Sequence, residues 1–509
     1  MKTGADRDAS NAHADSSPAW RGNWRAEFFD AVQTPLDVLV IGGGITGAGV
    51  LQAAANQGLR AALVEQRDFA WGSSSRSSKL VHGGLRYLKQ GHIGLTAAAL
   101  KARNALQKQY PDTISPRRFY LPYANRPPRL IQAGLAVYDV LAGRRSRAHH
   151  ARDSWLQQFP FLRNDQHHGA LSYLDAATDD CQLVLRVLMQ AMSRGALAAN
   201  YVAAETLLLD NAQQVRGAVL HDQLSDQRVE VRARVVVNAT GAWSDRLLAT
   251  GKSATPMRPL RGSHLVLPWH LLPLAEAIGC PHPQDGRPVY AVPWAGAVLF
   301  GTTDVDHDAP LELEPRISSA EYDYLMSALF RLFPELELKE SDIVSSFAGV
   351  RPTFADHHAD PSAASREHLI EESAGFVRIC GGKLTTFQLM ADEVLTRICR
   401  QLGLGKQRMQ QTPVPSITSH EPNPHFLGDS DLTEQHWQQA LTQAVQHLDD
   451  LLLRRTRIGL VEADGGLSLL QQRQQQLCRE LRWDDARWQQ EYARYRDIRQ
   501  RHYAAQAFR

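Results

Sequence analysis

The stretch Leu36-Asp-Val-Leu-Val-Ile-Gly-Gly-Gly-Ile-Thr-Gly47 decides the fold. Its apolar first half predicts a short buried strand, and the small-residue segment from about Thr46 to Gln57 predicts a helix. Arg60-Ala-Ala-Leu-Val-Glu65 predicts a second strand, which completes a β-α-β unit. Because a compact, alanine-rich helix packs closely on a parallel sheet, the pattern indicates an α/β, Rossmann-like domain.

The glycines of this stretch form a GxGxxG motif, which is typical of dinucleotide binding. Gly42 permits a tight turn, Gly44 lets a pyrophosphate approach the backbone, and Gly47 lets the helix pack close to the strand. The helix N-terminus near Thr46 offers N–H groups and a partial positive charge to phosphates. Glu65 ends the second strand and can accept hydrogen bonds from ribose hydroxyls. The motif predicts a dinucleotide site but does not separate NAD from FAD.

Two further glycine elements favour FAD. Asn238-Ala-Thr-Gly241 ends a strand and resembles the second dinucleotide-contacting motif of two-domain flavoproteins. Gly381-Gly-Lys-Leu-Thr-Thr386 follows another strand, and it could receive the pyrimidine carbonyls or the ribityl chain of a flavin. Three such elements from distant parts of the chain favour one long ligand, FAD. The contacts predicted from the two later elements are Thr240, Gly241, Gly382, Lys383, Leu384 and Thr385.

The pattern changes from about residue 257 to 350, where short strands alternate with turns. That change predicts an antiparallel sheet, and hence a second domain inserted in the first. Beyond about residue 430 the chain is rich in Gln, Arg and Leu with helical periodicity. The predicted division is a disordered lead-in (1–19), an FAD-binding domain (20–110, 172–250 and 346–404), a substrate domain (111–171 and 251–345), a linker (405–430) and a small helical C-terminal domain (431–509).

Composition excludes several classes of function. A chain of 509 residues is expected to form roughly two to four domains. The formal net charge of +2 gives no case for nucleic-acid binding. The five cysteines are scattered, which argues against a disulfide framework or a metal site and favours a reducing compartment. No run approaches the ~18 apolar residues of a membrane-spanning helix, so any contact with a membrane is expected at its surface.

The block Ser77-Ser-Lys-Leu-Val-His-Gly-Gly-Leu-Arg-Tyr-Leu88 resembles the SSKLIHGGLRYL signature of FAD-linked glycerol-3-phosphate dehydrogenases. Further blocks resemble that family in the same order: Arg261-Gly-Ser-His264, Gly301-Thr-Thr-Asp304, Gly349-Val-Arg-Pro352 and Gly381-Gly-Lys-Leu-Thr-Thr386. The resemblance is close over about residues 35 to 405 and looser in the tail. The segment from about 405 to 445 looks short and lacks the family's helix with a Tyr-Gly pair.

The resemblance implies a two-domain flavoprotein of the D-amino-acid-oxidase type. Such an enzyme would oxidise sn-glycerol 3-phosphate to dihydroxyacetone phosphate by hydride transfer to FAD, and would pass the electrons to a membrane quinone. We accordingly expect a cytoplasmic protein bound peripherally to the inner face of the cytoplasmic membrane, with a homodimer as one possible assembly. No metal is expected.

The substrate would be a small dianion with a secondary alcohol, so its site needs fixed cations and a proton acceptor. The resemblance assigns Arg86, Tyr87, His264, Arg351 and Lys383 to this site. His264 is a natural base because an imidazole titrates near neutral pH. Lys383 or Arg351 could instead stabilise an alkoxide while water takes the proton, so the identity of the base stays open.

The serine-rich run before the signature is expected to contact the flavin, and His82 to lie beside it. The predicted contacts in this region are Ser74, Ser78, Lys79, His82, Gly83 and Gly84.

Alternatives remain at this stage. An oxygen-reducing glycerol-3-phosphate oxidase, an amine- or hydroxy-acid-oxidising flavoprotein and a flavin-binding module without dehydrogenase activity would share the fold. For membrane docking, residues 126–147 are predicted to form a basic amphipathic face, with Arg126, Arg129, Leu130, Ile131, Leu135 and the cluster Arg144-Arg-Ser-Arg147. Arg454, Arg455 and Arg457 compete for that role.

Overall fold

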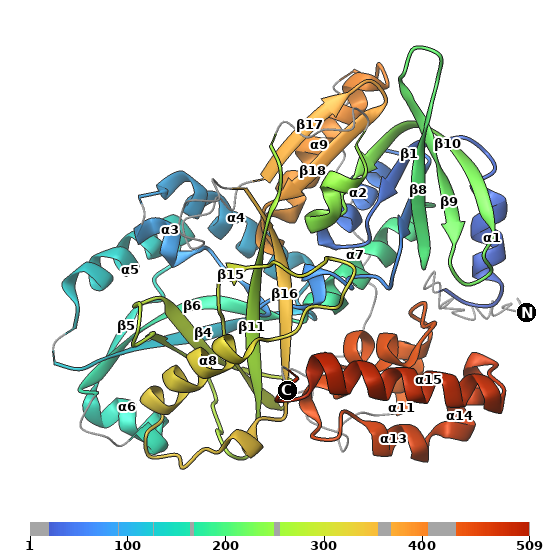
Figure 1. Ribbon diagram of the computed structural model, residues 1–509. Coiled ribbons are helices and arrows are strands. Elements are labelled where there is room, and N and C mark those ends of the chain that lie inside the picture. The colour runs from blue at the N-terminus through green and yellow to red at the C-terminus, as the bar shows by residue number, and fades with distance from the viewer. Residues whose placement is uncertain are drawn as a thin grey trace, which may run out of the picture.

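The computed structural model describes residues 20–89, 91–125, 127–162, 167–248, 255–354, 368–405 and 434–507. The predicted lead-in and nearly all of the predicted linker lie outside these ranges, as does Arg126. Figure 1 shows two sheets side by side and a block of helices formed by the C-terminal residues.

The first sheet has the strand order β17-β18-β10-β1-β2-β7. Its core strands run parallel, β1 between β2 and β10, and β17 adds an antiparallel edge. The β-α-β unit expected around the glycine motif is present, which confirms the α/β class. The strand bounds are β1 Leu36–Ile41, β2 Ala61–Glu65, β7 Leu197–Asn200, β10 Arg228–Asn238, β17 His368–Ser373 and β18 Phe376–Gly381, with β8 Val202–Leu209 and β9 Val215–Asp222 extending β10.

Apart from Asp37, the central strand β1 is buried on both faces, as its apolar run from Val38 to Ile41 requires. Val38 and Val40 belong to the core that also contains side chains of α2 (Ile45–Asn56), α7 (Asp180–Met192) and α9 (Phe387–Gln401). Leu39 and Ile41 belong to a second core with Phe28 and Phe29 of α1 (Trp24–Ala31) and with residues of β8 and β9. The sheet is therefore covered by separate layers on its two faces, as the ribbon in Figure 1 shows.

The second sheet has the order β15-β11-β14-β13-β12-β4-β6-β3, with β16 beside β11 and β5 beside β6. Its pairs are antiparallel except β4 with β12. The bounds are β3 Leu80–Val81, β4 Ile114–Tyr123, β5 Ala148–Ala151, β6 Gly169–Thr178, β11 Arg258–Pro268, β12 Ala277–Pro281, β13 Pro288–Trp294, β14 Ala297–Gly301, β15 Val305–Asp306 and β16 Ser345–Thr353.

Two domain boundaries differ from those expected. The boundary predicted at residue 172 falls inside β6, which pairs along its whole length with β4. The boundary predicted at 346 falls inside β16, which pairs with β11 from Ser345 to Thr353. Both strands therefore belong to the second sheet. Apolar periodicity identifies a strand, but it does not say which sheet the strand joins.

The C-terminal helices pack against the second sheet. Val266 of β11 shares a core with Trp437 and Leu452, whereas its neighbours Leu265 and Leu267 face the core of α8 (Ser319–Leu332) on the other side. The C-terminal elements are α11 Glu434–Leu441, the π-helical η7 Asp450–Arg455, α12 Ile458–Val461, α13 Leu467–Gln472, α14 Gln474–Leu481, α15 Asp485–Ile498 and η8 Arg499–Tyr503. Among the described ranges, no helix has the length and apolar character needed to cross a bilayer.

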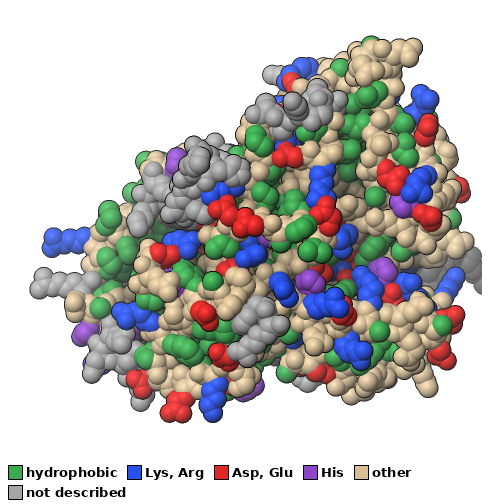
Figure 2. All heavy atoms as spheres, viewed as in Figure 1, with side chains coloured by type: hydrophobic (Ala, Val, Ile, Leu, Met, Phe, Trp, Pro, Cys, Tyr) green, Lys and Arg blue, Asp and Glu red, His purple; other side chains and the backbone are tan. Residues whose placement is uncertain are grey.

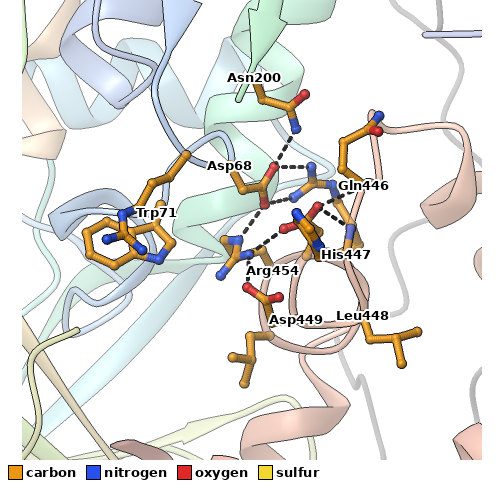
Figure 3. Close-up of polar contacts among 12 residues, drawn as sticks. Asp68, Trp71, Asn200, Gln446, His447, Leu448, Asp449 and Arg454 are labelled. Carbon is orange, nitrogen blue, oxygen red and sulfur yellow. Dashed lines mark hydrogen bonds and ion pairs between the residues drawn. The ribbon is translucent and has the colours of Figure 1, made fainter. Parts of the chain in front are cut away.

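Buried ion pairs join these helices to the first sheet (Figure 3). Asp68, just after β2, accepts hydrogen bonds from both terminal nitrogens of Arg455 at 2.7 Å and also pairs with Arg454. Arg454 reaches Asp449 at 2.7 Å and Asp450 at 2.6 Å as well. All these side chains are at most 3% exposed. Arg454 and Arg455 are therefore internal, and the suggestion that they face a membrane is wrong. The same holds for Arg457, whose side chain is 3% exposed.

Candidate active site

A pocket of about 370 Å³ opens where the parallel strands of the first sheet end. Gly42 and Gly44 follow β1, Thr240 follows β10 and Gly382 follows β18, and all four line it. Ligands of doubly wound α/β sheets bind at the carboxyl ends of the strands. The opposite wall comes from the second sheet and includes Gly262, Thr302, Gly349 and Arg351. The three glycine elements thus converge on one cavity between the two sheets.

The backbone around the first glycine element fits a pyrophosphate. Gly42 has a φ of +112°, and a Cβ there would lie 2.6 Å from the carbonyl oxygen of Ala239. A Cβ on Gly47 would lie 1.9 Å from the carbonyl oxygen of Gly42, so only glycine lets α2 approach β1 this closely. Gly44 and Thr46, at the start of α2, line the pocket. The first N–H groups of a helix have no acceptor within the helix, so this turn can donate to an anion.

Glu65 is placed to hold a ribose. Its carboxylate accepts hydrogen bonds from the N–H of Gly43 at 2.7 Å and of Arg67 at 2.9 Å, and the residue lines the pocket. Burial raises the pKa of Glu65, against the lowering effect of these two hydrogen bonds. Because a carboxylate has about four acceptor positions, the group retains capacity for hydroxyl donors. The residues present therefore fit FAD.

Most of the predicted flavin contacts do line this pocket. They are Gly42, Gly44, Thr46, Glu65, Ser74, Ser78, His82, Thr240, Gly241, Gly382, Lys383, Leu384 and Thr385. The segments are also tied together, since the N–H of His82 donates to the hydroxyl of Thr385 at 3.1 Å and the N–H of Ile45 donates to Ser74 at 3.0 Å.

Four predicted contacts lie elsewhere. Gly47 lies behind the wall and serves the packing of α2. Gly83 donates its N–H to Tyr138 at 3.0 Å, and Gly84, with a φ of +76°, packs against the ring of Tyr87. Lys79 departs most from the prediction, because its ammonium is fully buried. Neighbours in sequence can point to opposite sides of a segment, which the signature block alone does not reveal.

The ammonium of Lys79 belongs to the protein interior. It donates to both carboxylate oxygens of Asp180, at 2.8 and 2.9 Å, and to the carbonyl oxygen of Ser75 at 2.5 Å. The side chain has no exposed area. Lys79 is thus half of a buried ion pair and has no direct contact with the pocket.

Arg351 is oriented by two of the family-like blocks. Its guanidinium donates to Asp304 at 3.0 Å, to the hydroxyl of Thr302 at 3.0 Å and to the carbonyl oxygen of Thr303 at 3.2 Å. A Cβ on Gly262 would fall 2.1 Å from this guanidinium, so glycine makes room for it. Arg351 lines the pocket and is held there rather than free to swing.

Sequence reasoning missed a carboxylate beneath this wall. Glu321, which is 3% exposed, accepts from Ser263 at 2.8 Å and from Thr303 at 2.7 Å, and pairs with Arg261 at 2.8 Å. The feature of the sequence that could have identified Glu321 is the capping box that it forms with Ser318 at the start of α8. The pocket lining also includes Trp71 and Trp243, which lie 5.8 Å apart by ring centroids and belong to no recognisable motif.

Lys383 lies at the end of β18, with its Nζ 3.3 Å from the centroid of the Tyr87 ring. Tyr87 is 8% exposed and comes from α3 (Leu85–Lys89). Lys383 lines the pocket, so the pair brings the third glycine element against the signature block. The side chain of Arg86 lies outside the described part of the chain.

His264 is buried behind the pocket wall. It is 2% exposed, and its Nε2 hydrogen bonds with the hydroxyl of Ser78 at 2.9 Å. Its ring stacks on Phe347 with centroids 4.8 Å apart and planes 12° from parallel. Burial first, and then the charges of Arg351 and Lys79, hold the pKa of His264 well below its usual range. His264 is therefore a neutral imidazole, separated from the pocket by one hydroxyl group.

Comparison with known proteins places the chain in a class. A family model described as FAD dependent oxidoreductase matches residues 37–391. The match spans both sheets and every glycine element of the pocket. The fold and the site thus define an FAD-dependent oxidoreductase.

Individual relatives narrow the class. The aerobic glycerol-3-phosphate dehydrogenase of Bacillus subtilis is 37% identical over 375 residues, which are 72% of this chain and 67% of the relative. That of Staphylococcus saprophyticus is 35% identical over 383 residues, or 73% and 68% of the two chains. The chain belongs to the family of FAD-dependent aerobic glycerol-3-phosphate dehydrogenases.

Solved structures agree with this assignment. The glycerol-3-phosphate dehydrogenase from Bacillus halodurans complexed with FAD superposes with a TM-score of 0.73 at 25% identity, covering 95% of this chain and 98% of that one. The L-alpha-glycerophosphate oxidase from Mycoplasma pneumoniae with FAD bound gives 0.56 at 17% identity, covering 72% and 95%, and shows the shared fold.

Proposed function

We propose that this enzyme oxidises sn-glycerol 3-phosphate to dihydroxyacetone phosphate and passes the electrons to a membrane quinone. The observation that carries the proposal is that two cationic side chains, Arg351 and Lys383, line the same pocket as the flavin-binding glycines. A phosphorylated alcohol needs such cations, whereas an uncharged alcohol does not. The names of the relatives support the same substrate.

The two cations have different tasks. The guanidinium of Arg351 is fixed by Asp304 and Thr302, and its planar fork suits an anion such as phosphate. The ammonium of Lys383 is a compact charge steadied by the face of Tyr87. We assign phosphate binding to Arg351 and stabilisation of the substrate oxygen to Lys383.

Proton removal falls to His264 acting through Ser78. FAD held by the glycine cradle would supply the hydride acceptor. The hydroxyl of Ser78 lies between the pocket and Nε2 of His264, and a neutral imidazole can accept its proton. Ser78 can in turn accept the proton of the substrate hydroxyl. This arrangement accounts for a buried base with no pocket-facing atoms.

The membrane part of the proposal rests on α5 (Arg129–Ala142) and the segment after it. Leu130 and Val140, near the two ends of α5, are 78% and 79% exposed, and Arg144 and Arg145, just after its C-terminal end, are exposed too. At the edge formed by α5, Figure 2 shows apolar side chains beside basic ones. Such a surface can dock on anionic lipid. Leu135, expected on this face, is instead 1% exposed and packs inward.

We propose that α5 docks on the inner face of the cytoplasmic membrane, where the quinone is reached. An oxygen-reducing oxidase is the second candidate, because a glycerophosphate oxidase shares the fold. The homodimer stays a prediction.

Stopped-flow reduction of the flavin tests the substrate. Glycerol 3-phosphate should reduce the bound flavin rapidly and glycerol should not. Reoxidation of the reduced enzyme by a ubiquinone analogue in anionic vesicles, compared with air-saturated buffer, tests the acceptor. If oxygen reoxidises the enzyme faster than the ubiquinone analogue does, the oxidase is the better assignment.

A further inference from the structure

A row of buried charges runs from the C-terminal helices to the flavin-contact segment. The guanidinium of Arg457 lies 2.7 Å from Asp179 and 2.6 Å from Asp180, and Asp180 pairs with Lys79 at 2.8 Å. The two cations and two carboxylates balance. Lys79 and Asp180 have no exposed side-chain area, and Arg457 has 3%. Buried charges persist only when paired, so each member depends on the others.

Asp180 fixes the backbone of the segment that carries Ser78. It accepts hydrogen bonds from the N–H of Ser77 at 3.0 Å and from its hydroxyl at 2.7 Å. Lys79 has a φ of +58°, a left-handed conformation that is uncommon outside glycine. The ion pair holds Lys79 in that conformation from one side, and Ser77 is held from the other. Ser78, between them, is thereby aimed at His264.

A second connection passes through Phe347. The Nζ of Lys79 lies 5.2 Å from the centroid of this ring, and His264 stacks on the same ring. Burial lowers the pKa of Lys79 to about 8, so the group is a cation in the range where His264 titrates. The other cation that acts on His264 is Arg351 of β16, which also lowers the pKa of that imidazole.

The charges around both groups are accounted for. Arg261, on the same strand as His264, is paired with Glu321 of α8. Asp179 and Asp180 at the start of α7, and Arg457 from the C-terminal helices, are the charged groups that act on Lys79. Neither Lys79 nor Arg457 lines the pocket.

We propose that Lys79 is a positioning residue for His264, and that Arg457 holds it in place from the C-terminal helical domain. Lys79 acts on His264 through Ser78 and Phe347, as a fixed positive charge behind the base. The inference rests on the proposed function. It gives the C-terminal domain a positioning role in catalysis, because Arg457 of that domain holds Lys79, the charge behind the proton acceptor, in place.

The two test variants keep the buried charge balanced, whereas their common control leaves one cation in excess. Asp179 caps α7 by accepting from the N–H groups of Cys181 and Gln182, and asparagine caps equally well. Asp179→Asn alone is the control. Lys79→Met combined with Asp179→Asn leaves one cation and one carboxylate.

The first measurement is the pH dependence of kcat/KM with glycerol 3-phosphate. Relative to the Asp179→Asn control, the acidic limb of the pH profile of Lys79→Met/Asp179→Asn should move to higher pH by about half a unit. This is the size expected for the loss of one charge at this range. Removing the cation raises the pKa of His264, so the base is lost at higher pH. An unchanged limb in a variant with full FAD content overturns the proposal. If this variant does not bind FAD, Lys79→Gln in the same background takes its place.

A second variant tests the role of the C-terminal domain. Arg457→Gln/Asp179→Asn keeps the Lys79 charge, so the limb should stay in place while kcat falls on the order of tenfold. A kcat equal to that of the Asp179→Asn control would overturn the role of Arg457.

NMR titration of ¹³C-labelled histidine separates this inference from the proposed function. With His264→Asn as the assignment control, the pKa of His264 should be higher in the Lys79→Met/Asp179→Asn variant. If the enzyme does not oxidise glycerol 3-phosphate, the proposed function fails by itself and this titration still decides the inference. If the pKa of His264 is unchanged in that variant, the inference is overturned.

Discussion

Lys383 and Tyr87 form a cation–π pair with 3.3 Å between the ammonium nitrogen and the ring centroid. The two residues come from different family-like blocks, 296 positions apart in the chain. The pair fixes the one lysine that lines the pocket among the described residues.

Lys383→Met should lower kcat/KM for glycerol 3-phosphate by about a hundredfold or more, because losing the charged partner of a bound anion costs about 2–5 kcal/mol. Tyr87→Phe is the matched control: it keeps the aromatic face and should retain most activity. Equal losses in both variants would mean that the phenol hydroxyl, and not the ring, supports the site.

Arg351→Ala should lose most activity while the protein retains its FAD. The residue holds no part of the glycine cradle, and its partners Thr302 and Asp304 lie in the connection between β14 and β15 of the second sheet. Flavin absorbance per chain and steady-state kinetics check this. Glycerol should be a very poor substrate for the unchanged enzyme, and equal rates with glycerol and glycerol 3-phosphate would reject the phosphate site.

Gly44→Val should abolish flavin binding. Gly44 lines the pocket at the start of α2, and a Cβ there already lies 3.0 Å from the hydroxyl of Ser74. A branched side chain would occupy the position of the pyrophosphate. Gly94→Val, where a Cβ meets nothing within 4 Å, controls for the substitution itself. A Gly44→Val protein that is as yellow as the control would contradict the assignment of this turn.

The acidic limb of kcat/KM should lie below pH 6.5. His264 must be neutral to accept a proton, and burial together with Arg351 and Lys79 depresses its pKa. Activity is therefore retained as the pH falls past the ordinary histidine range, and is lost only as it passes the depressed value. A limb at or above pH 6.5 that survives in His264→Asn would assign the base to another group.

Vesicle co-sedimentation tests α5. Binding should require anionic lipid and weaken with salt, since the contribution of each exposed arginine is screened. Leu130→Ser/Val140→Ser and Arg144→Glu/Arg145→Glu should each reduce binding. Arg147 is a poorer target because it pairs with Asp139 at 3.1 Å. Leu209→Ser, at an exposed leucine of β8, is the control. Binding that is indifferent to all of these changes would exclude α5 as the docking surface.

The meeting of the three glycine elements could be predicted from the sequence, because each element combines a local turn with the end of a parallel strand. Gly42, Thr240 and Gly382, which were predicted to contact one ligand from their spacing and their strands, line one pocket. In the signature block it was harder to predict which side chains face the pocket, since Ser78 lines the pocket and the next residue, Lys79, is buried in the interior. That difference depends on the left-handed backbone conformation of Lys79, which no sequence motif predicts.

The ion-pair partners of the buried arginines could not be predicted from the sequence at all. Arg454, Arg455 and Arg457 form a basic run that is ordinarily solvated, yet the carboxylate partner of Arg457 at Asp179 is 278 positions away in the chain. Local patterns carry no information on such pairs. The inward side of α5 was misjudged for a related reason, because Leu135 and Leu130 are equally apolar and only the packing separates them.

The pairing of Asp68 with Arg454 and Arg455 has a consequence for synthesis. The carboxylate is made 386 and 387 residues before its two cations. At ribosomal rates of about 5–20 residues per second, the nascent chain holds Asp68 without them for roughly 20 to 80 seconds. Asn200, which donates to Asp68 at 3.0 Å, is made earlier, but in that interval water must take the place of the two guanidinium groups. We therefore expect the segment after β2 to reach its final packing only late in translation. A premature stop codon before the codon for Arg454 would therefore leave Asp68, near the start of the polypeptide, without either of its cationic partners.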